Sequence, residues 1–272
     1  MLVSKHSFGK KENKMAKIPY WKMQTDPVQY TDDVYYIGVT KAPAWLIKST
    51  DGLIVLDTAY PETLYLVMLN IAKLGFDYRD IKHIIHSHGH LDHFGGTPAL
   101  VELTGAKTYI GERDVDAVKG LRKNASNFIE IFEPDVIIHD GDVITIGDKE
   151  FHFLSTPGHT DGTMSIFFKT TYKGKEYQAG MFGGAGLNTL SLEYLDRMGY
   201  PHANREIYLD SIDRLYKYEI DVHLGNHLGD NKHLEKAKLM TEDYNPFIDP
   251  TSWRSFLDRR RKEAIELFES GK

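Results

Sequence analysis

The segment HSHGHLDHFGG, residues 86–96, places four histidines and one aspartate within eight positions. Protonated imidazole rings repel one another, and unpaired rings are costly to bury. A fold that contains this segment must therefore supply something that holds the rings together, and a metal ion is a common means. Within the segment, four residues form an H-x-H-x-D-H string: His88, His90, Asp92 and His93.

The residues that flank this string predict how it is presented. The apolar segment 81–87 before it is typical of a strand, and Gly95 and Gly96 after it precede a helix-forming segment. Side chains two positions apart on an extended chain point to the same side, so His88 and His90 can converge on one ion. Asp92 and His93 are adjacent, so they converge only if the backbone leaves the strand at that point.

Two further histidines stand at predicted strand ends followed by turn residues, His159 in STPGHTDG and His227 in HLGNHLGD. Together with the string they offer six nitrogen and oxygen ligands, and the chain has no cysteine that could contribute a thiolate. Six ligands divide into two sets of three, each with an open position for water, as in catalytic zinc sites. Two such ions can share a hydroxide whose pKa falls to about 7, which makes a nucleophile at neutral pH.

The rest of the chain predicts an α/β protein with two β-rich halves and helices outside the sheets. We expect a flexible N-terminal extension over residues 1–22, which are polar and basic, and a single hydrolase domain over 23–272. The predicted elements, in chain order, are strands at 34–40, 44–49 and 52–60, helices at 61–76 and 97–105, strands from 135 onward with a hairpin turning at Lys173–Gly174, and helices at 206–218 and 250–270. The run RRR at 259–261 is predicted to be a solvated helix face.

Taken in order, the motifs LDT (56–58), H-x-H-x-D-H, TPGHT (156–160) and a late strand-end histidine resemble the metallo-β-lactamase superfamily. The resemblance runs from about Val34 to the C-terminus and implies an αββα sandwich of two mixed β-sheets packed face to face. Thioester hydrolases of the glyoxalase II type, and the quorum-quenching lactonases, carry a metal-bridging aspartate on the strand after TPGHT. The corresponding segment here, 176–188, has no acid after Glu176. The ligand set and the tail NPFIDPTSWRSFLDRR (245–260) instead resemble the third subclass of class B β-lactamases.

This resemblance implies a binuclear di-zinc hydrolase, a β-lactamase that confers antibiotic resistance, with the following ligands: His88, His90 and His159 for the first zinc, and Asp92, His93 and His227 for the second. A metal-bridging hydroxide would attack the carbonyl of the β-lactam ring, and Asp92 would orient it as a catalytic residue. Asp57, at the end of its strand, would fix a ligand histidine. The subclass commonly has a serine near the metals where this chain has Gly184, so that hydrogen bond would be missing.

A second hypothesis is an intracellular metallo-hydrolase of another cyclic amide or ester, lactone-like, with little lactamase activity. The missing serine and the lack of an export signal favour it. A third class comprises metal-binding scaffolds without catalysis, against which the complete ligand set argues, and nucleic-acid-processing enzymes, against which the net charge of −6 argues. The ligands suit zinc best, although iron and manganese use similar sets.

The sequence predicts a small-molecule substrate and neither a nucleic-acid nor a membrane partner. No apolar signal-peptide core precedes the domain, so we expect a cytoplasmic protein, or a periplasmic or secreted one if the chain was trimmed. Position alone predicts two walls of the substrate cleft: residues 188–205, with Tyr194, Met198 and Tyr200, and residues 121–133, with Phe128 and Phe132. His86, two residues before His88, is predicted to have a packing role.

Overall fold

The structure is a computed structural model that describes residues 18–122 and 130–272, and its strands form two mixed sheets. The first sheet has seven strands in chain order: β1(Val28–Gln29), β2(Val34–Tyr36), β3(Trp45–Ser49), β4(Gly52–Leu56), β5(Ile81–Ile85), β6(Lys107–Gly111) and β7(Val136–Ile138). The second has the order β12-β11-β10-β9-β8, with these bounds: β8(Val143–Ile146), β9(Lys149–Ser155), β10(Met164–Tyr172), β11(Lys175–Met181) and β12(Val222–His223).

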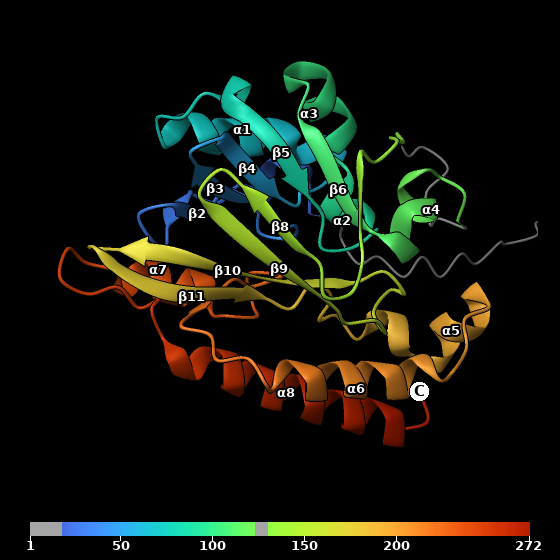
Figure 1. Cartoon of the computed structure of the whole chain (residues 1–272). Coiled ribbons are helices and arrows are strands. Elements are labelled where there is room, and N and C mark those ends of the chain that lie inside the picture. The colour runs from blue at the N-terminus through green and yellow to red at the C-terminus, as the bar shows by residue number, and fades with distance from the viewer. Residues whose placement is uncertain (1–17, 123–129) are drawn as a thin grey trace, which may run out of the picture.

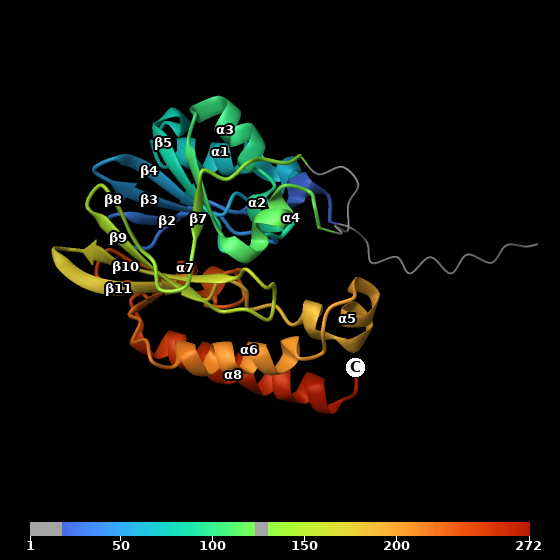
Figure 2. The ribbon, with the colours of Figure 1, turned by 45° about the vertical axis from the view of Figure 1, so that its right-hand side comes forward.

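The two sheets pack face to face and helices cover their outer faces (Figures 1 and 2). Helices α1(Leu64–Lys73) and α3(Thr97–Thr104) lie over the first sheet. Helices α6(Asn204–Leu215) and α8(Pro250–Glu269) lie over the second. The predicted αββα sandwich is therefore confirmed.

Strand β4 shows why the sequence pattern produces these layers. Its apolar residues alternate between two cores: Ile54 and Leu56 face the other sheet, whereas Leu53 and Val55 face the helices. A strand buried on both faces has a continuous apolar run, and GLIVL is such a run. The parallel pairing of β4 with β5 brings the end of β4, at Asp57, next to the segment that follows β5. The candidate site lies at this edge.

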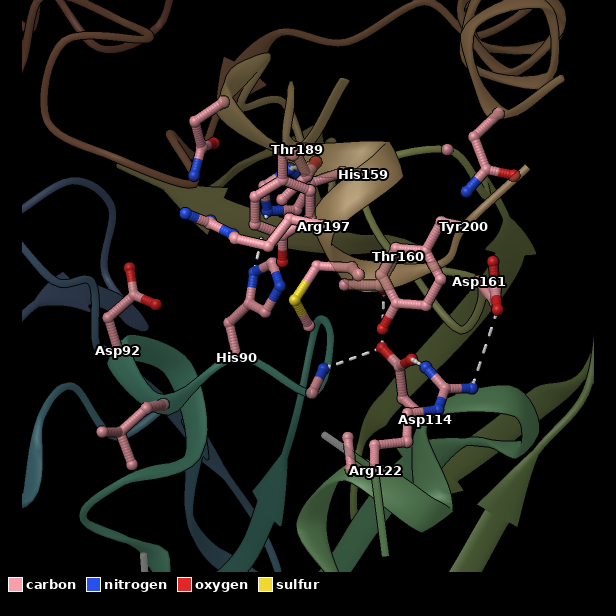
Figure 3. Close-up of a pocket in the computed structure, with 18 residues that line it drawn as sticks. His90, Asp92, Asp114, Arg122, His159, Thr160, Asp161, Thr189, Arg197 and Tyr200 are labelled. Carbon is pink, nitrogen blue, oxygen red and sulfur yellow. Dashed lines mark hydrogen bonds and ion pairs between the residues drawn. The ribbon is translucent and has the colours of Figure 1, made fainter. Parts of the chain in front are cut away.

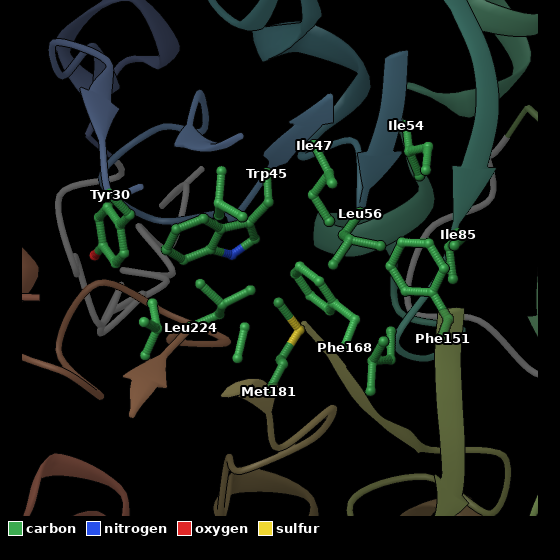
Figure 4. Packing of buried hydrophobic residues seen from close by; sticks show 14 of the residues in the cluster. Tyr30, Trp45, Ile47, Ile54, Leu56, Ile85, Phe151, Phe168, Met181 and Leu224 are labelled. Atoms are coloured by element: carbon green, nitrogen blue, oxygen red, sulfur yellow. The ribbon is translucent and has the colours of Figure 1, made fainter. Parts of the chain in front are cut away.

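The core between the sheets is built from large side chains of both (Figure 4). Trp45 from β3 and Phe168 from β10 are almost completely buried there. The Tyr30 ring stacks on Phe247 with 3.7 Å between centroids, which joins the segment before α8 to the first sheet. At about 25 cal/mol per Å² of apolar surface, burial of these side chains is the main force that holds the layers together.

The remaining helices connect or flank the layers. Four short helices were not predicted from the sequence: α2(Leu91–Phe94), α4(Val115–Val118), α5(Leu192–Met198) and α7(His233–Leu239). The 3₁₀ helices are η1(Tyr20–Met23), η2(Pro61–Thr63), η3(Tyr78–Asp80), η4(Glu112–Asp114) and η5(Asn188–Leu190). Residues 1–17 of the predicted extension lie outside the described residues, and its predicted boundary at residue 22 falls within η1. None of the helices in the described ranges has the length and apolarity that a transmembrane span needs.

Two buried histidines make stability depend on pH: His233 packs on Tyr30 and Phe247 of the inter-sheet core, and His223 packs on Trp253 and Phe256 of α8. Burial lowers the pKa of His233 to about 4 and the pKa of His223 to about 3, whereas both titrate near 6.5 in the unfolded chain. The free energy that these two histidines contribute to stability is therefore fully present above about pH 6.5. It is lost as the pH falls toward the folded-state pKa values, because the unfolded chain binds protons that the folded chain does not. At pH 5 each histidine should lower the free energy of unfolding by about 2 kcal/mol.

The variant His233→Asn tests this expectation, because it removes the titrating ring next to the Tyr30 hydroxyl. Urea unfolding of the chelator-treated protein at pH 7 and pH 5 should show a difference about 2 kcal/mol smaller than in the wild type. An unchanged difference would show that His233 does not titrate between these two pH values.

Candidate metal centre

The H-x-H-x-D-H string leaves the end of β5 as a short loop and then enters α2. His90 is the residue before the first helical position, while Asp92 and His93 lie within the helix. The backbone thus leaves the strand before Asp92 and His93, as the convergence of these two side chains requires. Gly95 and Gly96 permit this path because an added Cβ would lie 2.3 Å from Pro61 Cδ and 2.6 Å from the Thr58 carbonyl oxygen, respectively. Their role is close packing, as expected.

The first cluster consists of His88, His90 and His159, whose ligand nitrogens lie within 4.8 Å of one another. The His90 Nδ1 atom lies 3.0 Å from His88 Nε2 and 3.0 Å from His159 Nε2. The other nitrogens of two rings donate to backbone carbonyls, His88 Nδ1 to Gly183 at 2.7 Å and His159 Nδ1 to Gly186 at 2.8 Å. A carbonyl oxygen only accepts, so both Nδ1 atoms carry the proton and both Nε2 atoms present a lone pair.

This arrangement fits a metal ion. Burial lowers the pKa of His88 and of His159 well below the usual value, so both rings are neutral, which is the ligand form. Lone pairs that face one another at such short range repel unless a cation lies between them. The orientation of each ring by a carbonyl is also what fixes the tautomer of metal-binding histidines.

The second cluster consists of Asp92, His93 and His227, whose ligand atoms also lie within 4.8 Å of one another. The buried Nε2 of His93 has no hydrogen-bond partner, while its Nδ1 lies 2.7 Å from Asp57 Oδ2. Burial opposes charge on this ring, but the carboxylates of Asp92 and Asp57 outweigh it and raise the pKa of His93 to about 10. The cluster thus favours a positive charge between the Nε2 atom of His93 and the Asp92 carboxylate, whose Oδ2 lies 3.5 Å away.

Asp57 was predicted to fix a ligand histidine, and the structure places it against His93. Its fully buried carboxylate also accepts from the Ser87 backbone nitrogen at 2.8 Å and from the Ser87 hydroxyl at 2.7 Å. Both Asp57 and Ala59 have a positive φ, 57° and 59°, which is unfavourable for residues other than glycine. Such backbone strain is common at functional sites, and here the hydrogen bonds of Asp57 hold it in place.

The loop that carries His227 is anchored by the C-terminal helix. The backbone nitrogen of His227 donates to Asp230 Oδ2 at 2.9 Å, and Arg260 of α8 donates to Asp230 Oδ1 at 2.7 Å. Arg259 donates to the carbonyls of Gly229 and Asp230. The prediction of a solvated face for 259–261 is therefore wrong for Arg260, whose side chain is only 21% exposed.

Asp114 was missed by sequence reasoning. It is fully buried and accepts from the Gly89 backbone at 2.8 Å, the Thr160 hydroxyl at 2.6 Å and Arg122 Nη1 at 2.9 Å. It thus ties the loop that carries His90 to the loop that carries His159. The one sequence signal was its place just after the apolar strand β6, at the carboxyl edge of the parallel strands.

Both clusters border one cavity of about 590 Å³, which is lined by His90 and His159 of the first cluster and by Asp92 of the second (Figure 3). Tyr194, Met198 and Tyr200 line it, as predicted for the segment 188–205. The second predicted wall is wrong for Phe132, which packs near Phe94 and the His86 ring instead, while Phe128 lies outside the described residues. His86 itself has both nitrogens in hydrogen bonds, to the Tyr109 carbonyl at 2.8 Å and the Thr97 hydroxyl at 2.7 Å, consistent with a packing role.

Gly184 lies beside the first cluster, and the structure leaves no room for a side chain there. An added Cβ would meet Thr163 Oγ1 at 2.8 Å, Thr163 Cγ2 at 2.9 Å and His159 Cβ at 3.0 Å. The fully buried Thr163 hydroxyl is within 2.8 Å of the Thr160 hydroxyl, so it cannot move away without loss of that contact.

We therefore expect Gly184→Ser to lower the free energy of unfolding by about 1–3 kcal/mol, the usual cost of overpacking. Urea unfolding measures the change. Gly229→Ser is the matched control, because an added Cβ at Gly229 meets nothing within 4 Å. A Gly184→Ser protein as stable as the wild type would show that the neighbours of Gly184 yield to a serine.

The two mixed sheets, the outer helices and the paired His/Asp clusters at the sheet edge together define a metallo-hydrolase of the αββα sandwich class. The chain contains a metallo-beta-lactamase superfamily domain, since the model of that family matches residues 37–171. The resemblance predicted from the motifs is thus confirmed, and the family commonly binds zinc.

Solved structures similar to this chain include subclass B3 metallo-beta-lactamases. BJP-1 of Bradyrhizobium japonicum has a TM-score of 0.85 at 28% identity, over 93% of this chain and 97% of that one. Native FEZ-1 from Legionella gormanii has a TM-score of 0.83 at 26% identity, over 91% of this chain and 97% of that one.

Curated sequence relatives of this chain include thioester hydrolases. The acyl-coenzyme A thioesterase MBLAC2 of Homo sapiens is 25% identical over 169 residues, which make up 53% of this chain and 60% of that protein. Hydroxyacylglutathione hydrolases match over shorter segments, for example 82 residues of the protein from Maricaulis maris. The matches span between 27% and 60% of the lengths of these relatives.

Proposed function

We propose that this protein is a di-zinc hydrolase and that its substrates include β-lactams. The observation that carries the proposal is the pair of three-ligand clusters that border one cavity. The likeness to two subclass B3 lactamases over more than nine-tenths of the chain supports the β-lactam part. Among the described residues, neither cluster includes a carboxylate from the strand after His159, which distinguishes them from the glyoxalase II type.

Two zinc ions, when bound, would polarise a substrate carbonyl and lower the pKa of water toward neutrality. The residues of the chain would do the rest. His88, His90 and His159 would hold the first ion, while Asp92, His93 and His227 would hold the second. The carbonyls of Gly183 and Gly186, together with Asp57, keep three of the rings in the ligand tautomer.

Asp92 is the residue we propose to act on the nucleophile. It is the one carboxylate in the two clusters, and although burial opposes its charge, His93 and His227 keep its pKa below the usual value. An ionised carboxylate only accepts hydrogen bonds, so Asp92 would accept one from the attacking water and aim the water lone pair at the carbonyl carbon. The wall formed by Tyr194, Met198 and Tyr200 would exclude bulk water from the substrate.

A panel of β-lactams that includes a carbapenem tests this function. The zinc-loaded protein should hydrolyse at least one of them, and a chelator should abolish turnover, because the ligand clusters have no other source of Lewis acidity. Zinc added back should restore the rate. Turnover that persists in chelator, or two bound metals with no turnover of any β-lactam, would contradict the proposal.

Hydrolysis of a thioester is the second candidate, and the relatedness to MBLAC2 and to hydroxyacylglutathione hydrolases favours it. The same panel should therefore include an acyl-coenzyme A, a glutathione thioester and a lactone. If the chelator-sensitive rate is high on one of these and absent on every β-lactam, the site remains a hydrolase and the substrate class changes.

A further inference from the structure

The cavity of the candidate metal centre has a charged side chain on its wall that the proposed chemistry does not use. Arg197 lies near the end of α5 and lines the cavity together with His90, Asp92 and His159. Figure 3 shows Arg197 at the same end of the cavity as the two histidines, while Asp114 and Arg122 lie at the other end.

The other charged residues of the walls are already paired. Arg122 lies 2.9 Å from Asp114 and 3.8 Å from Asp161, so its charge is already balanced by carboxylates. Asp196, the neighbour of Arg197 in sequence, pairs with His202 at 2.8 Å. Within 18–122 and 130–272, no carboxylate forms an ion pair with Arg197.

An aromatic ring holds Arg197 in place. Its guanidinium carbon lies 5.3 Å from the centroid of the Tyr194 ring, three residues earlier on the same face of α5. No hydrogen bond or ion pair within 18–122 and 130–272 occupies the N–H groups of Arg197, so these donors are available to a ligand. A planar fork of N–H donors that is already oriented suits a carboxylate, which it can bind through two parallel hydrogen bonds.

The strand after His159 offers no replacement for this cation. Gly184 and Gly186 carry no hydroxyl, and an added Cβ at either would approach the His159 side chain to 3.0 Å. Arg122 and Arg197 are the arginines among the described lining residues, and only Arg197 has no carboxylate partner there.

We propose that Arg197, supported by Tyr194, is a subsite for a carboxylate of the substrate. The inference rests on the proposed hydrolase function of the same cavity and narrows its substrate class. The substrate is an amide or thioester that carries a free carboxylate away from the bond that is cleaved. Two sources share this chemistry, the carboxylate on the second ring of a bicyclic β-lactam and a carboxylate of a glutathione thioester.

The test compares each acid with its methyl ester on zinc-loaded wild-type, Arg197→Ala and Arg197→Lys proteins. With benzylpenicillin or lactoylglutathione, Arg197→Ala should raise KM for the acid about 10- to 100-fold and leave KM for the ester within about twofold. The value of kcat should change little, and Arg197→Lys should recover part of the loss. The acid whose KM rises in Arg197→Ala identifies the source of the carboxylate.

Arg254→Ala is the matched control. Arg254 lies on α8 outside the cavity, and its guanidinium carbon is 4.1 Å from the centroid of the Tyr216 ring at the end of α6. It should change neither KM. A wild type that binds acid and ester equally, or an Arg197→Ala variant that keeps the wild-type KM for both acids, would overturn the subsite while the hydrolase stands.

A binding measurement separates the two proposals. Ring-opened benzylpenicillin keeps its original carboxylate, gains a second one from ring opening and is not hydrolysed further, so calorimetry gives its Kd without turnover. The methyl ester of the original carboxylate, measured in the same way, shows which of the two carboxylates Arg197 binds. If the wild type hydrolyses nothing but Arg197→Ala weakens this Kd about 10-fold or more, the subsite stands and the proposed function fails. If neither turnover nor binding occurs, both are overturned.

Discussion

Replacing His159 by alanine should remove one bound metal and lower kcat/KM roughly 1,000-fold while the fold remains intact. The imidazole is one of three that converge on the first candidate ion, so its loss leaves only His88 and His90 there. A loss of about 4 kcal/mol of transition-state stabilisation, which is modest for a catalytic metal ion, corresponds to roughly this factor. Metal analysis after dialysis measures the stoichiometry, and steady-state kinetics measure the rate.

The matched control for this prediction is His152→Ala. The His152 side chain is 51% exposed on β9 and pairs with Glu150, so its loss should change neither metal content nor rate. Unfolding curves of both variants show whether the fold persists. Full activity in His159→Ala would remove His159 from the ligand set.

The second large effect is expected at Asp57, where two substitutions should separate stability from metal binding. Asp57→Ala leaves three buried donors without their acceptor and should lower the free energy of unfolding by about 3 kcal/mol or more. Asp57→Asn keeps the shape of the side chain, but its amide nitrogen donates where the carboxylate accepted.

If the amide nitrogen introduced by Asp57→Asn faces His93, the His93 Nδ1 must accept and its proton must move to Nε2. The lone pair that faces the second cluster is then lost. We therefore expect Asp57→Asn to cost only about 1–2 kcal/mol of stability but to weaken zinc binding at the second cluster about 10- to 100-fold. Competition with a calibrated chelator measures the affinity, and urea unfolding of the metal-free protein measures the stability. An Asp57→Asn protein with wild-type affinity would show that Asp57 does not set the His93 tautomer.

Much of this site could be predicted from local spacing. The two-residue interval between His88 and His90, and the glycines that end the loop, are local properties that predict converging ligands. The continuous apolar run of β4 likewise predicts a strand buried on both faces. These features depend on neighbours in sequence, and the structure agrees with them.

The parts that could not be predicted depend on contacts between distant segments. Asp114 has its partners near residues 89, 122 and 160, and nothing near it in sequence indicates them. Arg260 looked like part of a solvated run because its partner, Asp230, lies 30 residues earlier. Helix α5 is only seven residues long, too short for its periodicity to be recognised.

The two ligand clusters each combine residues from both halves of the chain, and this has a consequence for the lifetime of the protein. His90 and His159 are 69 positions apart, and a bound ion would join them as a cross-link between the two sheets. A cross-link of this kind limits how far the halves can separate and so removes loosened states from the unfolding pathway. Zinc supply would then govern how long the chain withstands proteases as well as how fast it turns over substrate.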